Sequence, residues 1–391
     1  MISRSAMRTG LPALLLGLLL AGCQTTDVAP ASSSTAALDD DEHRLWLRAR
    51  EEQEAIERSG FLVRLPSLDA YLDGLLTRLQ TRPLGAGGRL HAHVVVDPTL
   101  NAFALPDGAI YIHTGLLTRL DNEAQLATVL AHELTHSTHR HGVRNLRNLK
   151  NQTGFYASLT LSTGGMGGLL GLLGASSAIS GYSRELEHEA DEVGFRQLMQ
   201  VGYDPRESLK VFRILLAESR RSKIKEPYFF GSHPRLEERI ASYEQLVAAL
   251  APGQKQGLTG EAEFRTAIAP VYVLNANAAL HAGDFDAALD SARRRLAHAA
   301  DDTPAQLVLA ETYRRRAQGK DLTEALRLYQ TLATRPDAPA ESHRGLGLLL
   351  FKTDKTAAAA AFRRYLQAQP DAADRGHIET YLHQCESNSS S

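Results

Sequence analysis

The sequence contains very little cysteine. Only Cys23 and Cys385 occur in 391 residues, so a framework of several disulfides, as in small secreted domains, is excluded. Aromatic residues are also scarce, at 6% with a single tryptophan, whereas alanine and leucine are frequent. Because alanine and leucine favour helices over strands, this composition predicts a mainly helical fold. Cys385 stands alone near the C-terminus and has no predicted role.

A strong net charge is missing as well. The 43 basic residues (Lys and Arg) and 45 acidic residues (Asp and Glu) leave a net charge of −2. This balance provides no bulk attraction to nucleic acid or to anionic lipid, and we expect no nucleic-acid partner. The length suffices for one to three domains with at least one sizeable core.

The first 23 residues have the order of a secretory signal peptide. Arg4 and Arg8 precede an apolar run over residues 11–20, which is too short to span a bilayer comfortably. The small residues Ala21 and Gly22 follow, and then Cys23. A cysteine directly after small residues resembles a bacterial lipobox, in which Cys23 is lipidated and becomes the mature N-terminus.

The residues after Cys23 predict where the protein is delivered. Gln24 stands where an aspartate often signals retention in the inner membrane of Gram-negative bacteria. The lipobox resemblance therefore implies a lipid anchor in the outer membrane, with the body of the protein in the periplasm. Residues 24–40 are rich in Thr, Ser, Ala and Pro, which is typical of a flexible tether.

Two histidines four residues apart indicate a metal site. Residues 121–141 have the apolar periodicity of a helix, with Asp121 as the expected N-cap, and contain the sequence His132-Glu133-Leu134-Thr135-His136. Residues i and i+4 share a helix face, so the two imidazoles can bind one metal ion. Glu133 is placed to reach a metal-activated water instead, take its proton and pass it to a leaving amine.

Two more histidines follow this motif. His139 lies seven residues after His132 on the same face, and it could act as a ligand together with His136. We prefer the pair His132 and His136, because only this pair brackets a glutamate suited to act as a base. His139 and His141 are then expected around the ligands or at the surface.

A catalytic zinc site needs a third protein ligand and one position left for water. The acidic segment over residues 185–191 is helical in pattern, and Glu187 and Asp191 share one face. One of them can bind the metal while the other accepts a hydrogen bond from a ligand histidine. His188 is a further potential ligand, and a solvated charged face is the alternative for the whole segment. Two histidines and one glutamate favour zinc among the divalent ions.

These motifs together resemble the HtpX/Ste-type family of zinc metallopeptidases. The resemblance is carried by the HExxH helix, by Ser183-Arg184 about fifty residues later, and by the acidic spacing up to Asp191, with Gly194 after it. It implies one zinc ion per chain, with Glu187 as the third ligand and Asp191 as the partner of a ligand histidine. It also implies a mainly α (α+β) fold, in which a helical zincin-type domain contains a small β-sheet.

A predicted strand pair precedes the motif helix. Residues 101–112 are typical of two short strands around the turn Pro106-Asp107-Gly108. In the family, such a pair forms the edge along which an extended peptide lies, although a plain structural hairpin gives the same pattern. The resemblance assigns substrate binding to four residues of the first strand: Asn101, Ala102, Phe103 and Ala104.

Two further segments carry predictions. Gly231-Ser232-His233-Pro234 resembles a segment of the BepA-like periplasmic members of the family. There the matching histidine can reach the zinc and hold the enzyme latent, so His233 is implied to be a fourth ligand, or to steady the oxyanion once it has moved aside. Residues 164–174 are apolar but broken by glycines, which predicts a mobile lid, a helical hairpin or a weakly ordered loop rather than a membrane span.

The C-terminal third has a repeated pattern. Pro304, Pro336 and Pro370 recur every 32 to 34 residues, the period of tetratricopeptide repeats. Three degenerate repeats are predicted, with helix pairs stacked as an α-solenoid. The expected domains are a signal peptide with lipobox at 1–23, a tether at 24–40, a zinc metallopeptidase domain at 41–250, a linker at 251–269 and the repeats at 270–386.

A metallopeptidase domain followed by repeats resembles the BepA-like periplasmic proteases. It implies a zinc-dependent endopeptidase that cleaves misfolded or stalled envelope proteins in outer-membrane protein quality control. Unfolded or misassembled outer-membrane proteins are the implied substrates, and the barrel-assembly machinery is an implied partner of the repeats. The alternative is a periplasmic chaperone or assembly adaptor that acts mainly through its repeats. Glu133 argues against a purely structural zinc site, because no ligand role requires it.

Overall fold

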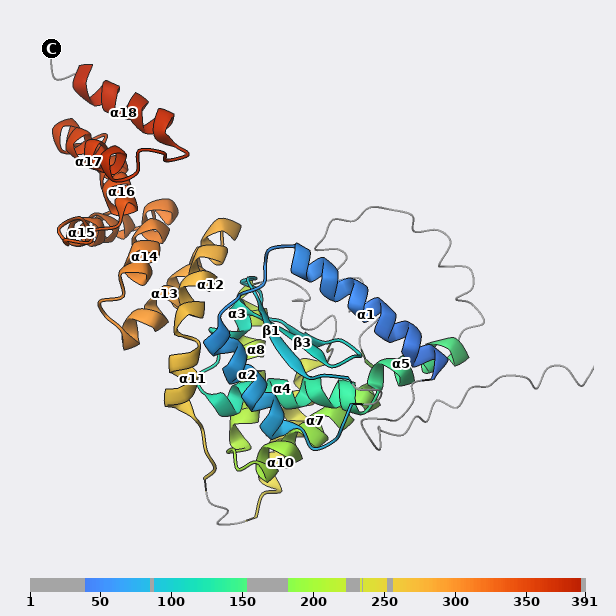
Figure 1. Ribbon diagram of the computed structural model, residues 1–391. Coiled ribbons are helices and arrows are strands. Elements are labelled where there is room, and N and C mark those ends of the chain that lie inside the picture. Colours follow the sequence, from blue (N-terminus) through green and yellow to red (C-terminus); the bar gives the residue numbers. More distant parts are fainter. Residues whose placement is uncertain are drawn as a thin grey trace, which may run out of the picture.

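The structure is a computed structural model, and it describes residues 39–84, 88–152, 182–222, 233, 235–251 and 256–387. The expected signal peptide with Cys23, the tether up to residue 38 and the segment 164–174 lie outside these residues. A mainly helical N-terminal domain with a small sheet is followed by an array of helices that extends away from it (Figure 1). The predicted fold class is therefore confirmed.

A three-stranded sheet lies in the N-terminal domain. Its strands β1 (His91–Val95), β2 (Ala102–Ala104) and β3 (Ala109–His113) have the order β1-β3-β2. β1 is parallel to β3, and β2 is antiparallel to it. The turn between β2 and β3 includes Gly108 at φ 99°, a left-handed conformation that glycine adopts without strain. In this order β2 is an edge strand of the sheet formed by the described residues.

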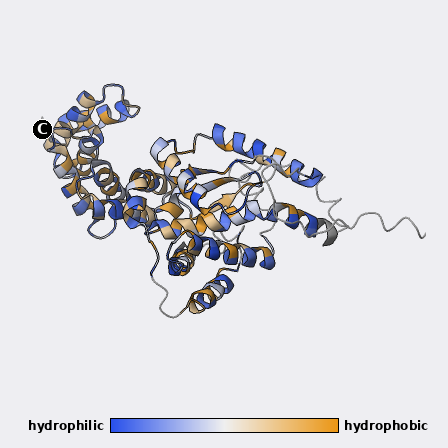
Figure 2. Ribbon diagram, turned by 60° about the horizontal axis from the view of Figure 1, so that its bottom comes forward, coloured by the Kyte–Doolittle hydropathy of each residue, from blue (hydrophilic) through white to orange (hydrophobic). Residues whose placement is uncertain are grey.

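Helices cover both faces of the sheet (Figure 1). Because strand side chains alternate, Ile110 and Ile112 enter the main core while Tyr111 packs on the opposite face. The opposite face is covered by α1 (Asp40–Arg58), and the hydrophobic colouring in Figure 2 concentrates in the interior between the helices. The main core is formed with α2 (Pro66–Leu79), α4 (Glu123–Thr138), α7 (Arg184–Gln200), α8 (Arg206–Ser222) and α10 (Leu236–Ala248).

The motif helix α4 begins and ends differently from the sequence expectation. Asn122, and not Asp121, is its N-cap, because the Asn122 side chain accepts a hydrogen bond from Gln125 N–H at 2.9 Å. The helix ends at Thr138, and Arg140 takes a left-handed φ of 55°. His141 therefore starts a second helix, α5 (His141–Gln152), in place of ending the first one.

Gly194 allows α7 to approach α4 closely. A Cβ atom built at Gly194 would lie 3.3 Å from the backbone nitrogen of His132, which is tighter than an ordinary contact. A glycine inside a helix costs about 0.5–1 kcal/mol relative to alanine. At this position the close helix contact offsets the cost, because it brings the acidic face of α7 next to the histidines of α4.

The C-terminal part is an array of antiparallel helix pairs. Consecutive helices pack on one another and bury two further hydrophobic clusters. The array is the helical repeat region predicted from the sequence, and its assignment to the tetratricopeptide class stays a prediction. It consists of α12 (Ala269–Ala282), α13 (Phe285–His298), α14 (Thr303–Arg316), α15 (Asp321–Ala333), α16 (Ala340–Leu350), α17 (Lys355–Ala368) and α18 (Arg375–Ser387).

The first helices of the array share the core of the N-terminal domain. Residues 261–267, within the expected linker, form the helix α11. Phe264 of α11, Ile268, and Val271 and Tyr272 of α12 are buried in the same cluster as the apolar residues of α4. The two parts of the chain are thus joined by packed side chains and not only by the backbone.

A buried polar network strengthens this junction. The side chain of Asn275 on α12 accepts a hydrogen bond from Thr114 (2.9 Å) and donates to Thr118 (3.1 Å) and Ser291 (2.7 Å). Thr114 begins the short helix α3 (Thr114–Leu117), which directly follows β3. Every polar group of the Asn275 side chain therefore has a partner, as a buried amide requires.

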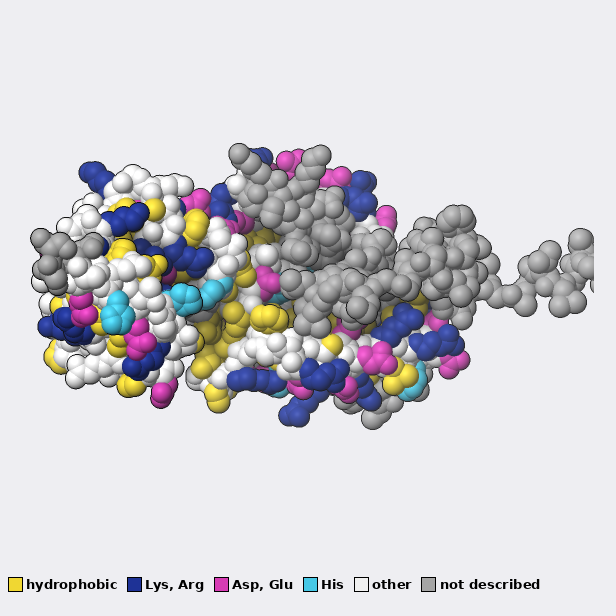
Figure 3. Space-filling model, turned by 90° about the horizontal axis from the view of Figure 1, so that it is seen from above, with side chains coloured by type: hydrophobic (Ala, Val, Ile, Leu, Met, Phe, Trp, Pro, Cys, Tyr) yellow, Lys and Arg dark blue, Asp and Glu magenta, His cyan; other side chains and the backbone are white. Residues whose placement is uncertain are grey.

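The surface carries no large region of one charge on the face that Figure 3 shows. Basic and acidic side chains alternate over it, in agreement with the nearly neutral composition. Among the described helices, none combines the length and the apolar character that a membrane crossing requires.

Candidate active site

Four buried side chains from separate parts of the chain meet at one point. His132 and His136 come from α4, Glu187 comes from α7, and His233 lies in a bend shortly before α10. One potential ligand atom of each lies within 4.8 Å of the others. His132 Nε2 is 3.0 Å from His136 Nε2 and 3.2 Å from His233 Nδ1. The structure thus brings together the four residues that the sequence singled out as ligands.

This donor set fits a zinc ion. Three imidazole nitrogens and one carboxylate oxygen are donors that zinc prefers. Glu187 Oε2 is buried and forms no hydrogen bond within the described part of the chain, although Arg239 Nη1 lies 3.1 Å away. The ring nitrogens of the three histidines face one another, so their lone pairs point at a common centre. A cation at this centre can accept all of these lone pairs.

The surroundings favour the deprotonated forms of two members of the cluster, Glu187 and His136. Burial would by itself raise the pKa of Glu187, but the positive charges of His233 and Arg239 outweigh it and lower that pKa. Burial, together with the neighbouring histidines, places the pKa of His136 well below its usual value. A carboxylate and a neutral imidazole are the forms that bind metal.

His233 has contacts on both sides of its ring. Its Nδ1 is 3.0 Å from Glu187 Oε1, and its Nε2 is 3.3 Å from Glu133 Oε1. Burial would by itself lower the pKa of His233, but the carboxylates of Glu187 and Glu133 outweigh it and raise the pKa to about 10. Glu133 lies beside the cluster and supplies no ligand atom to it.

Asp191 and Arg239 support the cluster by holding His132 in place. Asp191 Oδ1 lies 3.0 Å from His132 Nδ1, so the carboxylate can accept a hydrogen bond from this ring and fix its tautomer. Arg239 of α10 binds both oxygens of Asp191, at 2.8 Å through Nε and 2.6 Å through Nη2. Burial would raise the pKa of Asp191, but Arg239 outweighs it and holds that pKa well below its usual range.

The match to a known family covers all of these residues. Residues 66–247 match the model of peptidase family M48. This part of the chain is a peptidase family M48 domain. Its membership confirms the predicted zinc metalloendopeptidase class and the predicted zinc cofactor, and it agrees with the HtpX/Ste-type resemblance at the level of the family.

The M48 domain and its neighbours are also similar to curated proteins. The chain is 30% identical over 261 residues to a beta-barrel assembly-enhancing protease of Yersinia pestis, across 61% of this chain and 52% of that protein. The protein of the same name from Escherichia coli strain K12 is 29% identical over 201 residues, across 49% and 41%. Mitochondrial metalloendopeptidase OMA1 of Schizosaccharomyces pombe is 31% identical over 154 residues, across 39% and 45%. The chain spans about half the length of these relatives.

In the M48 domain His141 forms a second set of contacts that supports the cluster. Its Nδ1 lies 2.9 Å from His136 Nδ1, so one of the two nitrogens must be protonated and the other bare. Because Nε2 of His136 faces the cluster, its Nδ1–H donates and His141 accepts. Nε2 of His141 then faces Glu189 at 3.5 Å, and Arg144 binds Glu189 at 2.7 Å.

The remaining acidic and histidine candidates of the sequence lie apart from the metal cluster. Glu189 of the acidic segment belongs to the His141 contacts. The side chain of His188 is 57% exposed and pairs with Glu192, which removes it as a competing ligand. Glu185 is exposed as well, and His139 contacts Thr138 outside the cluster.

The register of β2 leaves backbone groups directed away from the sheet. His113 N–H donates to Asn101 O, and Leu105 N–H is likewise bonded to β3. In an antiparallel pair every second residue bonds to its neighbour strand. Ala102 and Ala104 therefore turn their N–H and C=O groups toward the side of β2 that has no neighbouring strand among the described residues.

The side chains of the four predicted substrate residues point in different directions. Ala102 is buried in the main core beside α4, and Asn101 is buried next to it. Phe103 stacks on Tyr111 at 5.2 Å on the α1 side of the sheet. Ala104 faces a small pocket that His136 also lines. The structure brings this strand next to the metal cluster, and its role in substrate binding stays a prediction.

Proposed function

We propose that this chain is a zinc-dependent endopeptidase that cleaves misfolded or stalled envelope proteins in outer-membrane quality control. The observation that carries the proposal is the buried cluster of His132, His136 and Glu187 with Glu133 beside it, inside an M48 domain. Similarity to two beta-barrel assembly-enhancing proteases supports the class of substrate. The signal peptide and lipobox up to Cys23 support a periplasmic protein anchored to the outer membrane.

The catalytic roles follow from the positions of the side chains. His132, His136 and Glu187 would hold the zinc ion, with His233 as a fourth donor. A bound zinc ion supplies Lewis-acid polarisation of a peptide carbonyl and of the attacking water. The Glu133 carboxylate takes a proton from that water and delivers it to the amine nitrogen of the leaving peptide.

The edge of β2 supports recognition of unfolded segments. The outward N–H and C=O groups of Ala102 and Ala104 can pair with an extended peptide, and such pairing reads the backbone and not the sequence. Only a segment that is not already in a sheet or helix offers free backbone groups. The repeats, fixed to the M48 domain through Asn275, then present substrates or dock on the barrel-assembly machinery.

The substrate class can be tested with one barrel protein in two states. We expect the purified protein to cleave an unfolded outer-membrane barrel protein and to spare the same protein folded in detergent micelles. Removal of the metal with a chelator should abolish cleavage, and added zinc should restore it. Fragments are followed by gel electrophoresis and mass spectrometry. Binding of the unfolded protein without cleavage, at full zinc occupancy, would support the chaperone or adaptor function instead.

Replacement of His233 by alanine is expected to raise basal proteolysis several-fold. The side chain places Nδ1 among the ligand atoms and Nε2 beside Glu133, so it occupies the space where water and substrate must enter. Cleavage of casein is measured together with zinc content. His188→Ala is the matched control, because His188 is exposed and lies away from the cluster. Unchanged or lower activity with retained zinc would contradict a latch at this position.

A further inference from the structure

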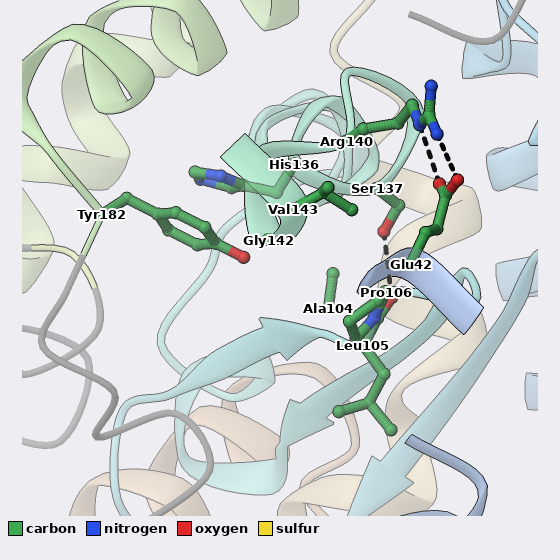
Figure 4. Close-up of a pocket in the computed structure, with 10 residues that line it drawn as sticks. All are labelled: Glu42, Ala104, Leu105, Pro106, His136, Ser137, Arg140, Gly142, Val143 and Tyr182. Carbon is green, nitrogen blue, oxygen red and sulfur yellow. Dashed lines mark hydrogen bonds and ion pairs between the residues drawn. The ribbon is translucent and has the colours of Figure 1, made fainter. Parts of the chain in front are cut away.

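A small pocket lies between the metal cluster and the end of β2. In Figure 4 the rings of His136 and Tyr182 lie on one side of it, and Ala104, Leu105 and Pro106 lie on the other. Its free volume is about 10 Å³, which is room for about one water molecule. The pocket is therefore too small for a substrate side chain, but it is large enough for the oxygen atom of a carbonyl group.

One hydroxyl group at this pocket lacks a partner. The hydroxyl of Ser137 donates to Leu105 O at 3.2 Å, and Arg140 donates to Glu42, with Nε 2.8 Å from Oε1, as the dashed lines in Figure 4 mark. The hydroxyl of Tyr182 points into the pocket and has no hydrogen-bond partner within the described part of the chain. Because a buried tyrosine hydroxyl usually finds a partner, this donor is available to a group that the chain does not supply.

The position of the Tyr182 hydroxyl is fixed by its surroundings. Tyr182 directly precedes Ser183, the N-cap of α7, whose side chain accepts a hydrogen bond from Leu186 N–H at 3.4 Å. The ring of Tyr182 stacks on the ring of His136, with centroids 3.9 Å apart and planes inclined by 15°. The centroid of the His233 ring lies 6.2 Å away. Since the hydroxyl is carried by a rigid ring, stacking on a member of the cluster also fixes the direction in which it points.

The pocket lies where the scissile carbonyl of a substrate is expected. An extended peptide that pairs with Ala102 and Ala104 passes the pocket, because Ala104 lines it together with His136 of the cluster. When water attacks the scissile carbonyl, negative charge develops on the oxygen of that carbonyl. A hydrogen bond to a charged oxygen is roughly twice as strong as one to a neutral oxygen. A donor at this position therefore stabilises the transition state more than the bound substrate.

We propose that Tyr182 is a further catalytic residue, whose hydroxyl donates a hydrogen bond to the oxygen of the scissile carbonyl as negative charge develops there. The inference rests on the proposed peptidase function. The hydroxyl keeps its proton throughout, so no bond at Tyr182 is made or broken, and the proton transfers remain with Glu133. His233 is less suited to this task, because its two ring nitrogens face the carboxylates of Glu187 and Glu133.

Tyr182→Phe removes the hydroxyl and keeps the ring that stacks on His136. On a fluorogenic peptide, kcat should fall by about 100- to 1,000-fold, the usual loss when one oxyanion donor is removed, with KM and zinc content nearly unchanged. Tyr381→Phe in α18 is the matched control, because Tyr381 also packs against an aromatic ring, 4.9 Å from Phe351, but lies in the repeat array. An unchanged kcat in Tyr182→Phe overturns the proposal. A fall in kcat that comes with loss of zinc also overturns it, since Tyr182 then only holds His136 in place.

Binding of a phosphinic peptide separates this inference from the proposed function. In this probe a tetrahedral, negatively charged phosphinate replaces the scissile amide, so it offers the charged oxygen that the hydroxyl should bind. Its Kd on the zinc-loaded protein should be about 10- to 100-fold higher for Tyr182→Phe than for the wild type. The Kd of the matching amide peptide, measured on Glu133→Gln with and without Tyr182→Phe, should stay the same.

The two measurements together leave a clear outcome. If the wild type cleaves no peptide but Tyr182→Phe weakens phosphinic binding alone, the hydrogen-bond donor stands and the peptidase function fails. Equal Kd values of the phosphinic peptide for the wild type and Tyr182→Phe overturn the proposal whatever the cleavage result. An equal loss of affinity for the phosphinic and the amide peptide overturns it as well, because the hydroxyl would then bind substrate and transition state alike.

Discussion

Replacing Glu133 by glutamine is expected to lower the rate of peptide cleavage by about 100- to 10,000-fold, the usual contribution of a general acid–base group. Glutamine has the same shape but cannot take a proton from water. Glu133 is only 1% exposed and contributes no ligand atom to the cluster, so zinc binding and stability should be nearly unchanged. The measurement is kcat/KM on a fluorogenic peptide, with zinc content determined for the same samples.

Two comparisons make this result decisive. Glu185→Gln changes an exposed glutamate on α7 in the same way and should keep full activity. In cells that lack the chain, Glu133→Gln should fail to restore envelope integrity. Full restoration by this variant would show that the chain acts as a chaperone or adaptor, with a zinc site that is not used for catalysis.

Replacing Arg239 by methionine is expected to destabilise the protein by about 3–5 kcal/mol, the cost of leaving one partner of a buried ion pair alone. Arg239 is 5% exposed and holds both oxygens of the buried Asp191, while its guanidinium also lies 4.6 Å from the centre of the Phe212 ring. Because Asp191 in turn contacts His132, zinc affinity should fall by about 10- to 100-fold. Urea unfolding and competition with a zinc chelator measure the two effects.

Arg184→Met is the matched control for this prediction. Arg184 of α7 pairs with Glu238 of α10, so it links the same two helices, but its side chain is 65% exposed. An exposed pair contributes about 0–1 kcal/mol. Combining Arg239→Met with Asp191→Asn should recover part of the stability, because the unpaired charge of Asp191 is removed, although Glu187 still lacks its contact with Arg239. Equal losses in the Arg239 and Arg184 variants would show that Arg239 does not hold Asp191 in place.

The members of the cluster on α4 and α7 could be predicted from the sequence because their signals are local. His132, Glu133 and His136 fall within one turn of a helix, and the spacing of Glu187 and Asp191 defines a second helix face. Gly194 was only part of the family pattern, and the structure shows it where these helices approach each other. His233 followed only from a family resemblance, since a histidine before a proline has no pattern of its own.

Apart from Asp191, the supporting residues could not be predicted, because they depend on contacts across the chain. Arg239 reaches Asp191 from a helix 48 positions later, and nothing in its own surroundings distinguishes it from a surface arginine. His141 reaches His136 because the left-handed turn at Arg140 redirects the chain. Glu189 was overlooked for the same reason, since its partners belong to α5.

The core shared by α4 and α12 extends beyond the segment that matches the family model. The family match ends at residue 247, yet Phe264, Ile268, Val271 and Tyr272 complete the interior of the matched region. A chain cut at residue 250 would leave that interior open to water, and Thr114 and Thr118 would lose the amide of Asn275. The smallest self-sufficient folded piece of this chain is therefore longer than the segment that matches the family model, and the first repeat helices are as much a part of its core as the motif helix α4.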